Sequence, residues 1–145
     1  MKIYLDNCCF NRPFDDQTQE RIHLESEAIL MILKMGQIGE YRIVGSDILK
    51  LEIERMHDEV KKYRVRELYN VVGENVIYTE AIKKRAQEIM EQSNIRSFDS
   101  MHIASAETAN ADVMLTTDDK LEKMASKLQL KIRVMNPLKF AWEAI

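Results

Sequence analysis

Four acidic side chains of this 145-residue chain stand where carboxylates could bind a metal ion together: Asp6, Glu52, Asp99 and Asp118. Asp6 directly follows the apolar segment 2–5, and Asp118 follows a second one, 113–116, within three residues. If both segments are strands of a parallel sheet, the two acids leave it at the carboxyl edge, where α/β proteins bind ligands. Asp112 precedes its strand and is therefore excluded.

Glu52 is included in this set because of the face that it occupies on a predicted helix. In the helix that Ser46 is expected to cap, Glu52 shares a face with the apolar residues Ile48 and Leu49, whereas Glu54 faces solvent. A carboxylate that points inward is costly unless it is paired or bound to a metal. A buried salt bridge to an arginine is the alternative interpretation of Glu52.

Asp99 lies in the first turn of a predicted helix over 98–109, in which Ser97 is the expected cap. A first-turn aspartate is often only a partner of the helix dipole. His102, on the same side of that helix, is interpreted as a packed core histidine. Together the four acids form an oxygen-rich set that suits Mg²⁺ or Mn²⁺. Such a site can activate water and stabilise the leaving oxygen of a phosphodiester.

Composition places few limits on this chemistry. Hydrophobic residues make up 46% and charged residues 31% of the chain, which is typical of one globular domain spanning residues 1–145. The only cysteines, Cys8 and Cys9, are adjacent, so we interpret them as small buried thiols and not as a disulfide. No segment is apolar enough for a membrane span or a signal peptide, and we expect a cytoplasmic protein.

The charge pattern bears on a nucleic-acid substrate. A net charge of −3 argues against binding a polyanion. However, four basic residues fall within six positions: Lys61, Lys62, Arg64 and Arg66. A solvated helix face is the ordinary interpretation of such a run, and contact with an RNA backbone is the functional one.

Short apolar segments alternate with longer helical patterns along the whole chain. This alternation predicts a three-layer α/β/α fold with a parallel sheet of about five strands. The predicted strands are 2–5, 41–44, 76–78, 113–116 and 132–134. The predicted helices are 18–35, 46–56, 58–71, 80–92 with Thr79 as its cap, 98–109, 119–128 and a short last helix opened by Pro137.

Four blocks of the sequence, in this order, resemble the PIN-domain family of nucleases. The start Ile-Tyr-Leu-Asp6 is similar to the opening strand and first acid of the family. Ser46-Asp-Ile-Leu-Lys-Leu-Glu52 resembles the second block, Phe98-Asp99-Ser-Met-His-Ile-Ala the third, and Thr116-Thr-Asp118 the fourth.

The resemblance implies a sheet in the order 3-2-1-4-5 and Mg²⁺- or Mn²⁺-dependent cleavage of RNA. It implies that Asp6, Glu52, Asp99 and Asp118 are metal-site acids and that the Thr116 hydroxyl orients them. Small bacterial and archaeal members are VapC-type toxins of toxin–antitoxin pairs and are often homodimers. An antitoxin partner and a homodimer are therefore expected here.

The first loop departs from the family pattern. Members usually have a small polar residue two places after the first aspartate, whereas this chain reads Asp6-Asn7-Cys8-Cys9. Either Asn7 supplies the polar contact from a shifted position, or the metal is held more loosely. Further along the loop, Arg12 could reach a phosphate.

Two alternatives come from other classes of protein. A phospho-receiver domain would need an aspartate after the third strand and a lysine after the fifth, but these places hold Thr79 and Met135-Asn136. A catalytically inactive PIN-like module that binds RNA or protein is the second alternative. The retained acids count against it.

Overall fold

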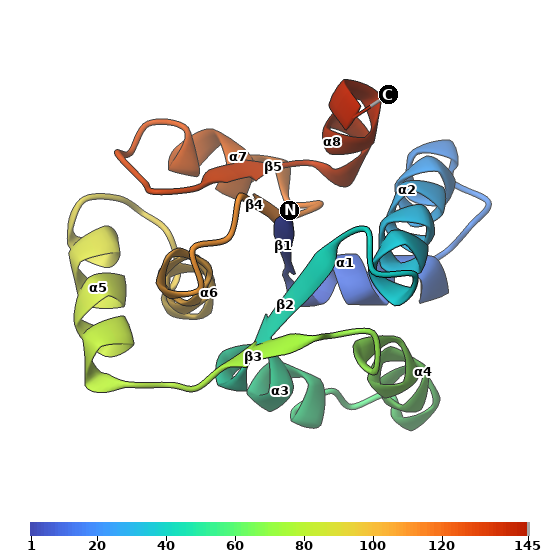
Figure 1. Ribbon diagram of the computed structural model, residues 1–145, viewed down its shortest axis with the longest axis horizontal. Coiled ribbons are helices and arrows are strands. Elements are labelled where there is room, and N and C mark those ends of the chain that lie inside the picture. The colour runs from blue at the N-terminus through green and yellow to red at the C-terminus, as the bar shows by residue number, and fades with distance from the viewer. Residues whose placement is uncertain (145) are drawn as a thin grey trace.

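Five parallel strands form the central sheet of the protein, a computed structural model of which describes residues 1–144 (Figure 1). The sheet has the order β3-β2-β1-β4-β5, which confirms the order that the family resemblance implied. Its middle strand, β1, pairs with both β2 and β4. The strands are β1 (Lys2–Leu5), β2 (Arg42–Ser46), β3 (Glu74–Val76), β4 (Val113–Leu115) and β5 (Arg133–Met135).

Helices cover both faces of the sheet, as a parallel sheet requires. Side chains alternate along a strand, so Ile3 and Leu5 of β1 enter one core while Tyr4 enters the other. The first core packs under α1 (Asn7–Asn11), α2 (Glu20–Gln37), α3 (Asp47–Glu54), α4 (Glu59–Tyr69) and α8 (Pro137–Ala144). The second packs under α5 (Glu80–Glu91), α6 (Ser97–Thr108) and α7 (Asp119–Ala125).

Side-chain caps fix where several helices begin. The hydroxyl of Ser46 accepts a hydrogen bond from the N–H of Leu49, and that of Thr79 accepts one from Ile82, so both predicted caps are confirmed. The expected cap at Ser97 is wrong: this residue already lies inside α6, whose N-cap position is Arg96.

Several element boundaries differ from the sequence prediction, most of them by one to three residues. Strand β3 ends at Val76 instead of beginning there. The helix α2 continues to Gln37, past Gly36. The segment after Asp6 is helical, because α1 is followed by a 3₁₀ turn, η1 (Arg12–Phe14), so the acid stands at a helix N-terminus rather than in an open loop.

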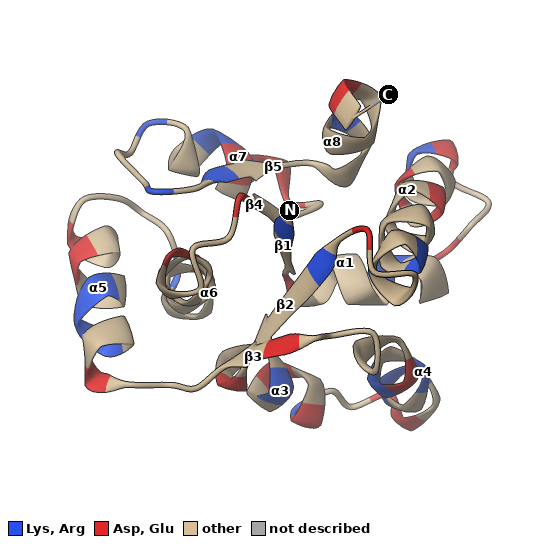
Figure 2. Ribbon diagram, in the orientation of Figure 1, with Lys and Arg blue, Asp and Glu red and all other residues tan. Residues whose placement is uncertain are grey.

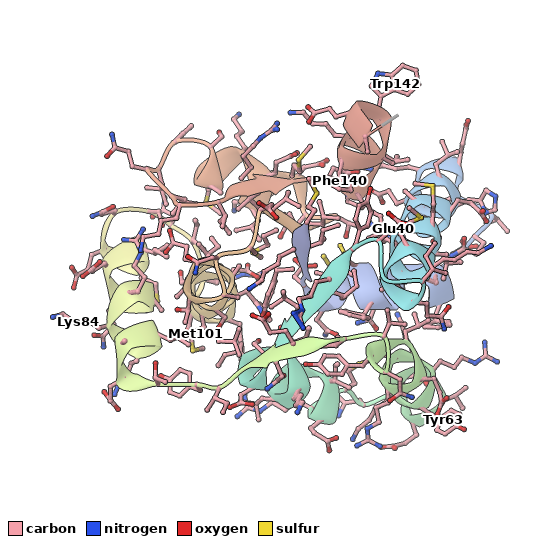
Figure 3. All side chains as sticks on the ribbon, in the orientation of Figure 1. Glu40, Tyr63, Lys84, Met101, Phe140 and Trp142 are labelled. Atoms are coloured by element: carbon pink, nitrogen blue, oxygen red, sulfur yellow. The ribbon has the colours of Figure 1, made fainter. Side chains whose placement is uncertain are left out.

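Charged residues occur on most of the helices, and basic and acidic residues are intermixed on α4 (Figure 2). The last helix shows both environments: Phe140 is 7% exposed and packs in the core, whereas Trp142 is 80% exposed and points away from the molecule (Figure 3). None of the helices in residues 1–144 is both long enough and apolar enough to cross a membrane.

Candidate active site

One polar pocket at the carboxyl edge of the sheet gathers all four predicted acids, and its volume is about 310 Å³. Asp112, excluded by its place in the sequence, lies at the opposite edge, where its carboxylate accepts a hydrogen bond from the backbone of Lys2. The pocket is lined by Asp6, Asn7, Cys8, Asn11, Asp15, Glu52, Arg96, Asp99, His102 and Asp118.

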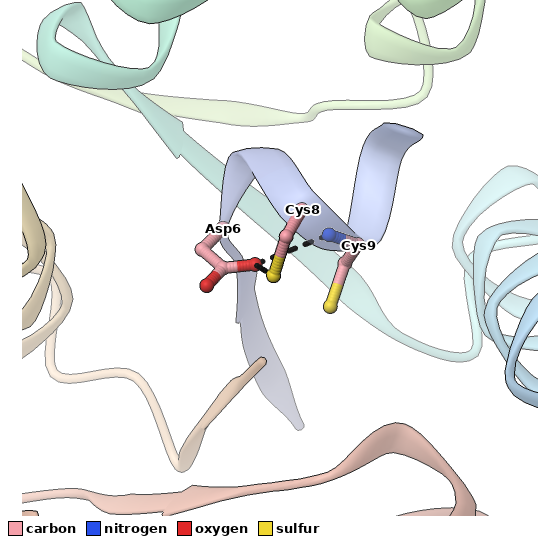
Figure 4. A group of neighbouring side chains, drawn as sticks. All are labelled: Asp6, Cys8 and Cys9. Carbon is pink, nitrogen blue, oxygen red and sulfur yellow. Dashed lines mark hydrogen bonds between the residues drawn. The ribbon is translucent and has the colours of Figure 1, made fainter. Parts of the chain in front are cut away.

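Asp6 is the most buried of these acids, with 4% of its surface exposed. It is the N-cap of α1, and its Oδ1 accepts hydrogen bonds from the Cys9 N–H at 3.1 Å and the Cys8 thiol at 2.8 Å (Figure 4). Burial raises the pKa of Asp6 well above its ordinary value, and Cys8 adds to that shift, while Thr116 and His102 act in the opposite direction. Both of these hydrogen bonds use Oδ1.

Asp99 lies across the pocket in the first turn of α6. Burial, followed by the charge of Asp6, raises the pKa of Asp99 to about 6, against smaller opposite effects of His102 and Arg96. Its basic neighbour is weakly placed: Arg96 is 82% exposed, and its Nε lies 3.9 Å from Asp99 Oδ2. Two nearby carboxylates with so little compensation are a typical setting for a bound cation.

Glu52 reaches the pocket from α3, and a chain of buried hydrogen bonds fixes its orientation. Its carboxylate contacts Nε2 of His102, whose Nδ1 lies 2.6 Å from the hydroxyl of Tyr4. That hydroxyl is in turn 2.6 Å from the hydroxyl of Ser46, the residue that caps α3. If Ser46 donates to Tyr4 and Tyr4 to His102, then His102 carries its proton on Nε2 and donates it to Glu52.

This network corrects the interpretation of His102 as only a core residue. His102 is buried, with 1% exposed, yet it also lines the pocket. Its position three residues after Asp99, on the same helix face, was the sequence signal that could have linked the two.

Asp118 is held by the start of α7. Its Oδ1 accepts hydrogen bonds from the N–H groups of Lys120 and Leu121, and its own N–H donates to the Thr116 hydroxyl at 3.1 Å. The second carboxylate oxygen receives no hydrogen bond from residues 1–144 and is available to a ligand in the pocket. The Thr116 hydroxyl therefore contacts the backbone of Asp118 at the start of α7.

The polar contact that we expected from Asn7 is made by Cys8. The side chain of Asn7 accepts a hydrogen bond from Asn11, whereas the Cys8 sulfur contacts Asp6, lies 3.4 Å from the Thr116 hydroxyl and accepts the N–H of Thr117. Hydrogen bonding with Cys9, and then with Asp6 and the two threonines, lowers the pKa of Cys8 to about 6 against the effect of burial.

The donor atoms of the pocket fit a divalent cation without forming a complete cage. Asp6, Cys8 and Cys9 are the one set of three His, Cys, Asp or Glu side chains in residues 1–144 whose donor atoms all lie within 4.8 Å of one another. The carboxylates of Glu52, Asp99 and Asp118 line the same pocket at wider spacing. Magnesium usually keeps several waters and takes only one or two carboxylates, so this spacing suits a hydrated ion.

The predicted RNA-binding residues make three kinds of contact. Arg12 and Lys61 both contact Asp15, an acid of the pocket wall, and Arg12 also contacts Glu25. Arg64 lies over the ring of Phe14. Lys62 and Arg66 are directed away to Glu54, the carboxylate that the sequence placed in solvent and that is 58% exposed.

A sequence comparison with known protein families matches the PIN domain model over residues 3–127. The chain belongs to the PIN domain family. All four acids and Thr116 fall within the matched region, which ends in the segment that follows α7.

Solved structures give the same fold at low sequence identity. The chain is similar to a VapBC2 structure from Rickettsia felis bound to a promoter DNA fragment, with a TM-score of 0.66 and 12% identity over 94% of this chain and 98% of the other. A VapBC-1 structure from nontypeable Haemophilus influenzae matches with a TM-score of 0.60 and 16% identity over 94% and 98%. A FitAB structure bound to the IR36 DNA fragment matches at 0.58 and 18%, over 94% and 95%. A search of the curated proteins finds no match.

Proposed function

We propose that this PIN domain is a metal-dependent endoribonuclease whose catalytic acids are Asp6, Glu52, Asp99 and Asp118. One observation carries the proposal: the four carboxylates share a single pocket, and two of them, Asp6 and Asp99, are largely withdrawn from water, with the mostly exposed Arg96, 3.9 Å from Asp99, as their arginine neighbour. Such an arrangement is unfavourable in an empty pocket and favourable around a cation.

Different residues of the pocket would bind the metal ion, orient its ligands and bind the RNA phosphate. Asp6 and Asp118 each have one carboxylate oxygen fixed by hydrogen bonds at a helix N-terminus, and both residues line the pocket. His102 holds Glu52 in place. When bound by these acids, Mg²⁺ or Mn²⁺ would supply a nucleophilic water and stabilise charge on the phosphate. Arg96, at the mouth of the pocket, is suited to bind an RNA phosphate.

We further propose that the protein is the toxin of a toxin–antitoxin pair, with a small antitoxin as partner and a homodimer as its assembled form. The fold likeness to VapBC and FitAB proteins supports this role. Exposed apolar side chains on α2, including Leu24, Leu30 and Met31, are suited to a protein contact. Sedimentation of the protein alone, and with the product of a neighbouring short reading frame, measures both associations.

Cleavage of single-stranded RNA tests the nuclease directly. The wild-type protein should cut with Mn²⁺ or Mg²⁺ and stop in EDTA. Asp99→Asn should lose about 100-fold in rate, because a lost carboxylate removes stabilisation of the transition state. Asp112→Asn is the matched control, since this acid lies at the opposite edge and its new amide can still accept the Lys2 N–H.

Two results would contradict the proposal. Cleavage by pure protein in EDTA would exclude the metal mechanism. Absence of any cleavage, combined with a melting temperature that Mn²⁺ does not change, would favour the inactive module that binds RNA or protein without cutting it.

A further inference from the structure

A stretch of unbalanced positive charge runs from α7 into α8. Residues 120–139 contain six basic residues and one acid, Glu122, although the net charge of the chain is −3. Glu122 accepts the backbone N–H of Asn136, and Arg133 is paired with Glu143. The other five basic residues are exposed lysines that form no salt bridge with residues 1–144: Lys120, Lys123, Lys127, Lys131 and Lys139. Their charge is available to an anionic partner.

Three of these lysines share the outward face of α7. Lys120, Lys123 and Lys127 are separated by three and four residues, which places them on one side of α7 and of the turn that follows it. This side is opposite to Leu121 and Ala125, which are buried in the second core. Figure 2 shows basic residues along α7, the loop after it and β5. The three ammonium groups therefore form a row on the surface, which we call the α7 lysine row.

The helix α7 joins the acid pocket to a second hollow of the surface. Asp118, the N-cap of α7, lines the acid pocket, and Lys120 follows it by two residues. At the other end of the helix, Ala125 and Ser126 line a hollow of about 290 Å³, together with Lys139. The seven residues of α7 span about 10 Å. The α7 lysine row thus begins beside the proposed catalytic acids and leads away from them.

The basic run of α4 lacks this free charge. Lys61 is paired with Asp15, and Lys62 and Arg66 are paired with Glu54. A phosphate that approaches α4 must compete with these carboxylates, whereas a phosphate at the α7 lysine row displaces no salt bridge. The density of basic residues in the sequence favoured α4, but the unpaired charge lies on α7.

We propose that the α7 lysine row binds the phosphate backbone of the RNA strand whose cleavage site lies in the acid pocket. Lysine binds a phosphate as a point charge, without the fork geometry of arginine, so these contacts hold a strand without selecting its sequence. The four carboxylates of the pocket repel a polyanion, and the lysines offset this repulsion directly beside them. The inference rests on the proposed function, because it takes RNA as the ligand. The rival occupant is an acidic segment of a partner protein, for which the start of the row beside the acid pocket has no significance.

Binding of a labelled single-stranded RNA to the full-length protein in EDTA tests the inference without cleavage. The α7 variant combines Lys120→Gln, Lys123→Gln and Lys127→Gln. It should reduce the slope of log affinity against log salt concentration by about 2, because each lost contact with a single strand contributes about 0.7. At about 0.1 M salt, the affinity for RNA should fall by at least about tenfold.

A matched control removes the same charge from other elements. It combines Lys34→Gln, Lys83→Gln and Lys84→Gln, which replace three exposed lysines of α2 and α5. The control has the same net charge as the α7 variant but keeps the α7 lysine row, so its slope should equal that of wild type. Thermal melts of both variants check that they are folded.

The inference is overturned if wild type binds no RNA in EDTA or if the α7 variant keeps the slope of wild type. Equal reductions in both variants also overturn it, because they reflect net charge alone. If the α7 variant keeps its affinity for RNA but no longer binds the product of a neighbouring short reading frame, the occupant is an acidic protein segment. Cleavage with Mn²⁺ keeps the two proposals apart. Cleavage by wild type with an unchanged slope in the α7 variant refutes only this inference, and RNA binding through α7 without cleavage refutes only the nuclease.

Discussion

Buried carboxylates occur in two kinds of surroundings in this protein. Glu25 on α2 is fully buried, yet it receives the Nε of Arg12 at 2.9 Å, the Nε of Arg21 at 3.2 Å and the amide of Asn136 at 2.6 Å. Every one of these donors comes from the protein. Glu25 is thus paired within the fold and joins α2 to the 3₁₀ turn and to the end of β5.

Glu107 on α6 repeats this arrangement, with Arg85 Nε at 2.7 Å and the Lys131 N–H at 2.9 Å. In the acid pocket, by contrast, burial raises the pKa of both Asp6 and Asp99, and the nearest arginine is a largely exposed one. The comparison teaches that burial alone does not mark a functional acid. A buried acid whose charge no buried arginine balances, as with Asp6 and Asp99, is the better candidate, because a bound cation could balance that charge.

The largest expected effect is on the stability of the protein and concerns Glu25, the buried acid that is paired with two arginines. Glu25→Gln leaves two arginines with a neutral partner in the interior, so we expect a loss of about 3 kcal/mol in the free energy of unfolding. Urea denaturation at neutral pH measures it, with EDTA and with Mn²⁺. The loss should be the same in both, and a loss that Mn²⁺ restores would mean that Glu25 belongs to the metal site.

Neutralising Asp99 should stabilise the metal-free protein, whereas neutralising Glu25 destabilises it. Its pKa is about 6 in the folded state and near 4 in the unfolded chain, so the folded state binds the proton more tightly. The stability that this proton provides is complete below about pH 4 and is lost as the pH rises to about 6. In EDTA at pH 7.5, Asp99→Asn should therefore be more stable than wild type by about 2 kcal/mol.

Denaturation at pH 4 and pH 7.5 tests this linkage, because the advantage of Asp99→Asn should vanish at the lower pH. Added Mn²⁺ should stabilise wild type more than the variant and reduce or reverse the difference at pH 7.5. If Asp99→Asn is less stable than wild type at both pH values in EDTA, Asp99 is a structural acid like Glu25.

Much of the fold could be predicted because it depends on local patterns. The alternation of apolar segments and helical periods predicted the layers, and the helical phase of α3 placed Glu52 in the pocket and Glu54 in solvent. The resemblance to PIN domains added the strand order. Boundaries such as that of β3 were wrong because Val76, Ile77 and Tyr78 are all apolar, while pairing with β2 selects Glu74–Val76.

The partners of the site residues could not be predicted in the same way. The contacts of His102 with Tyr4 and Glu52 span 98 and 50 residues, and those of Glu25 with Asn136 span 111. The contact of Cys8 with Asp6 is local, but it depends on the short helix α1. No periodic pattern of apolar residues in the sequence predicts this helix. Partners of this kind are fixed by tertiary packing, and sequence spacing alone does not reveal them.

Glu52 and Glu54, both on α3, allow a comparison within one helix, in which the expected effect is smaller. Glu52→Gln keeps the contact with His102 but removes the charge that it offers to the pocket, so cleavage should fall about tenfold, or about 1.4 kcal/mol. Glu54→Gln should leave cleavage unchanged and shift stability by no more than about 0.5 kcal/mol, as an exposed position does. Equal loss of activity in both variants would show that the charge of α3 as a whole, and not Glu52 in the pocket, is what matters.

The smallest expected effect concerns RNA binding, and it compares two exposed arginines. Arg96 lies at the mouth of the pocket, whereas Arg66, in the basic run of α4, is paired with Glu54. If Arg96 contacts a phosphate, Arg96→Gln should reduce the slope of log affinity against log salt concentration by about 0.7, the value for one contact with a single strand. Arg66→Gln should leave the slope unchanged, because Glu54 already neutralises that charge. Both slopes can be measured in EDTA with a labelled RNA, so that cleavage does not interfere. A reduced slope in Arg66→Gln alone would move the RNA path from the pocket mouth to α4, as the density of basic residues in the sequence first indicated.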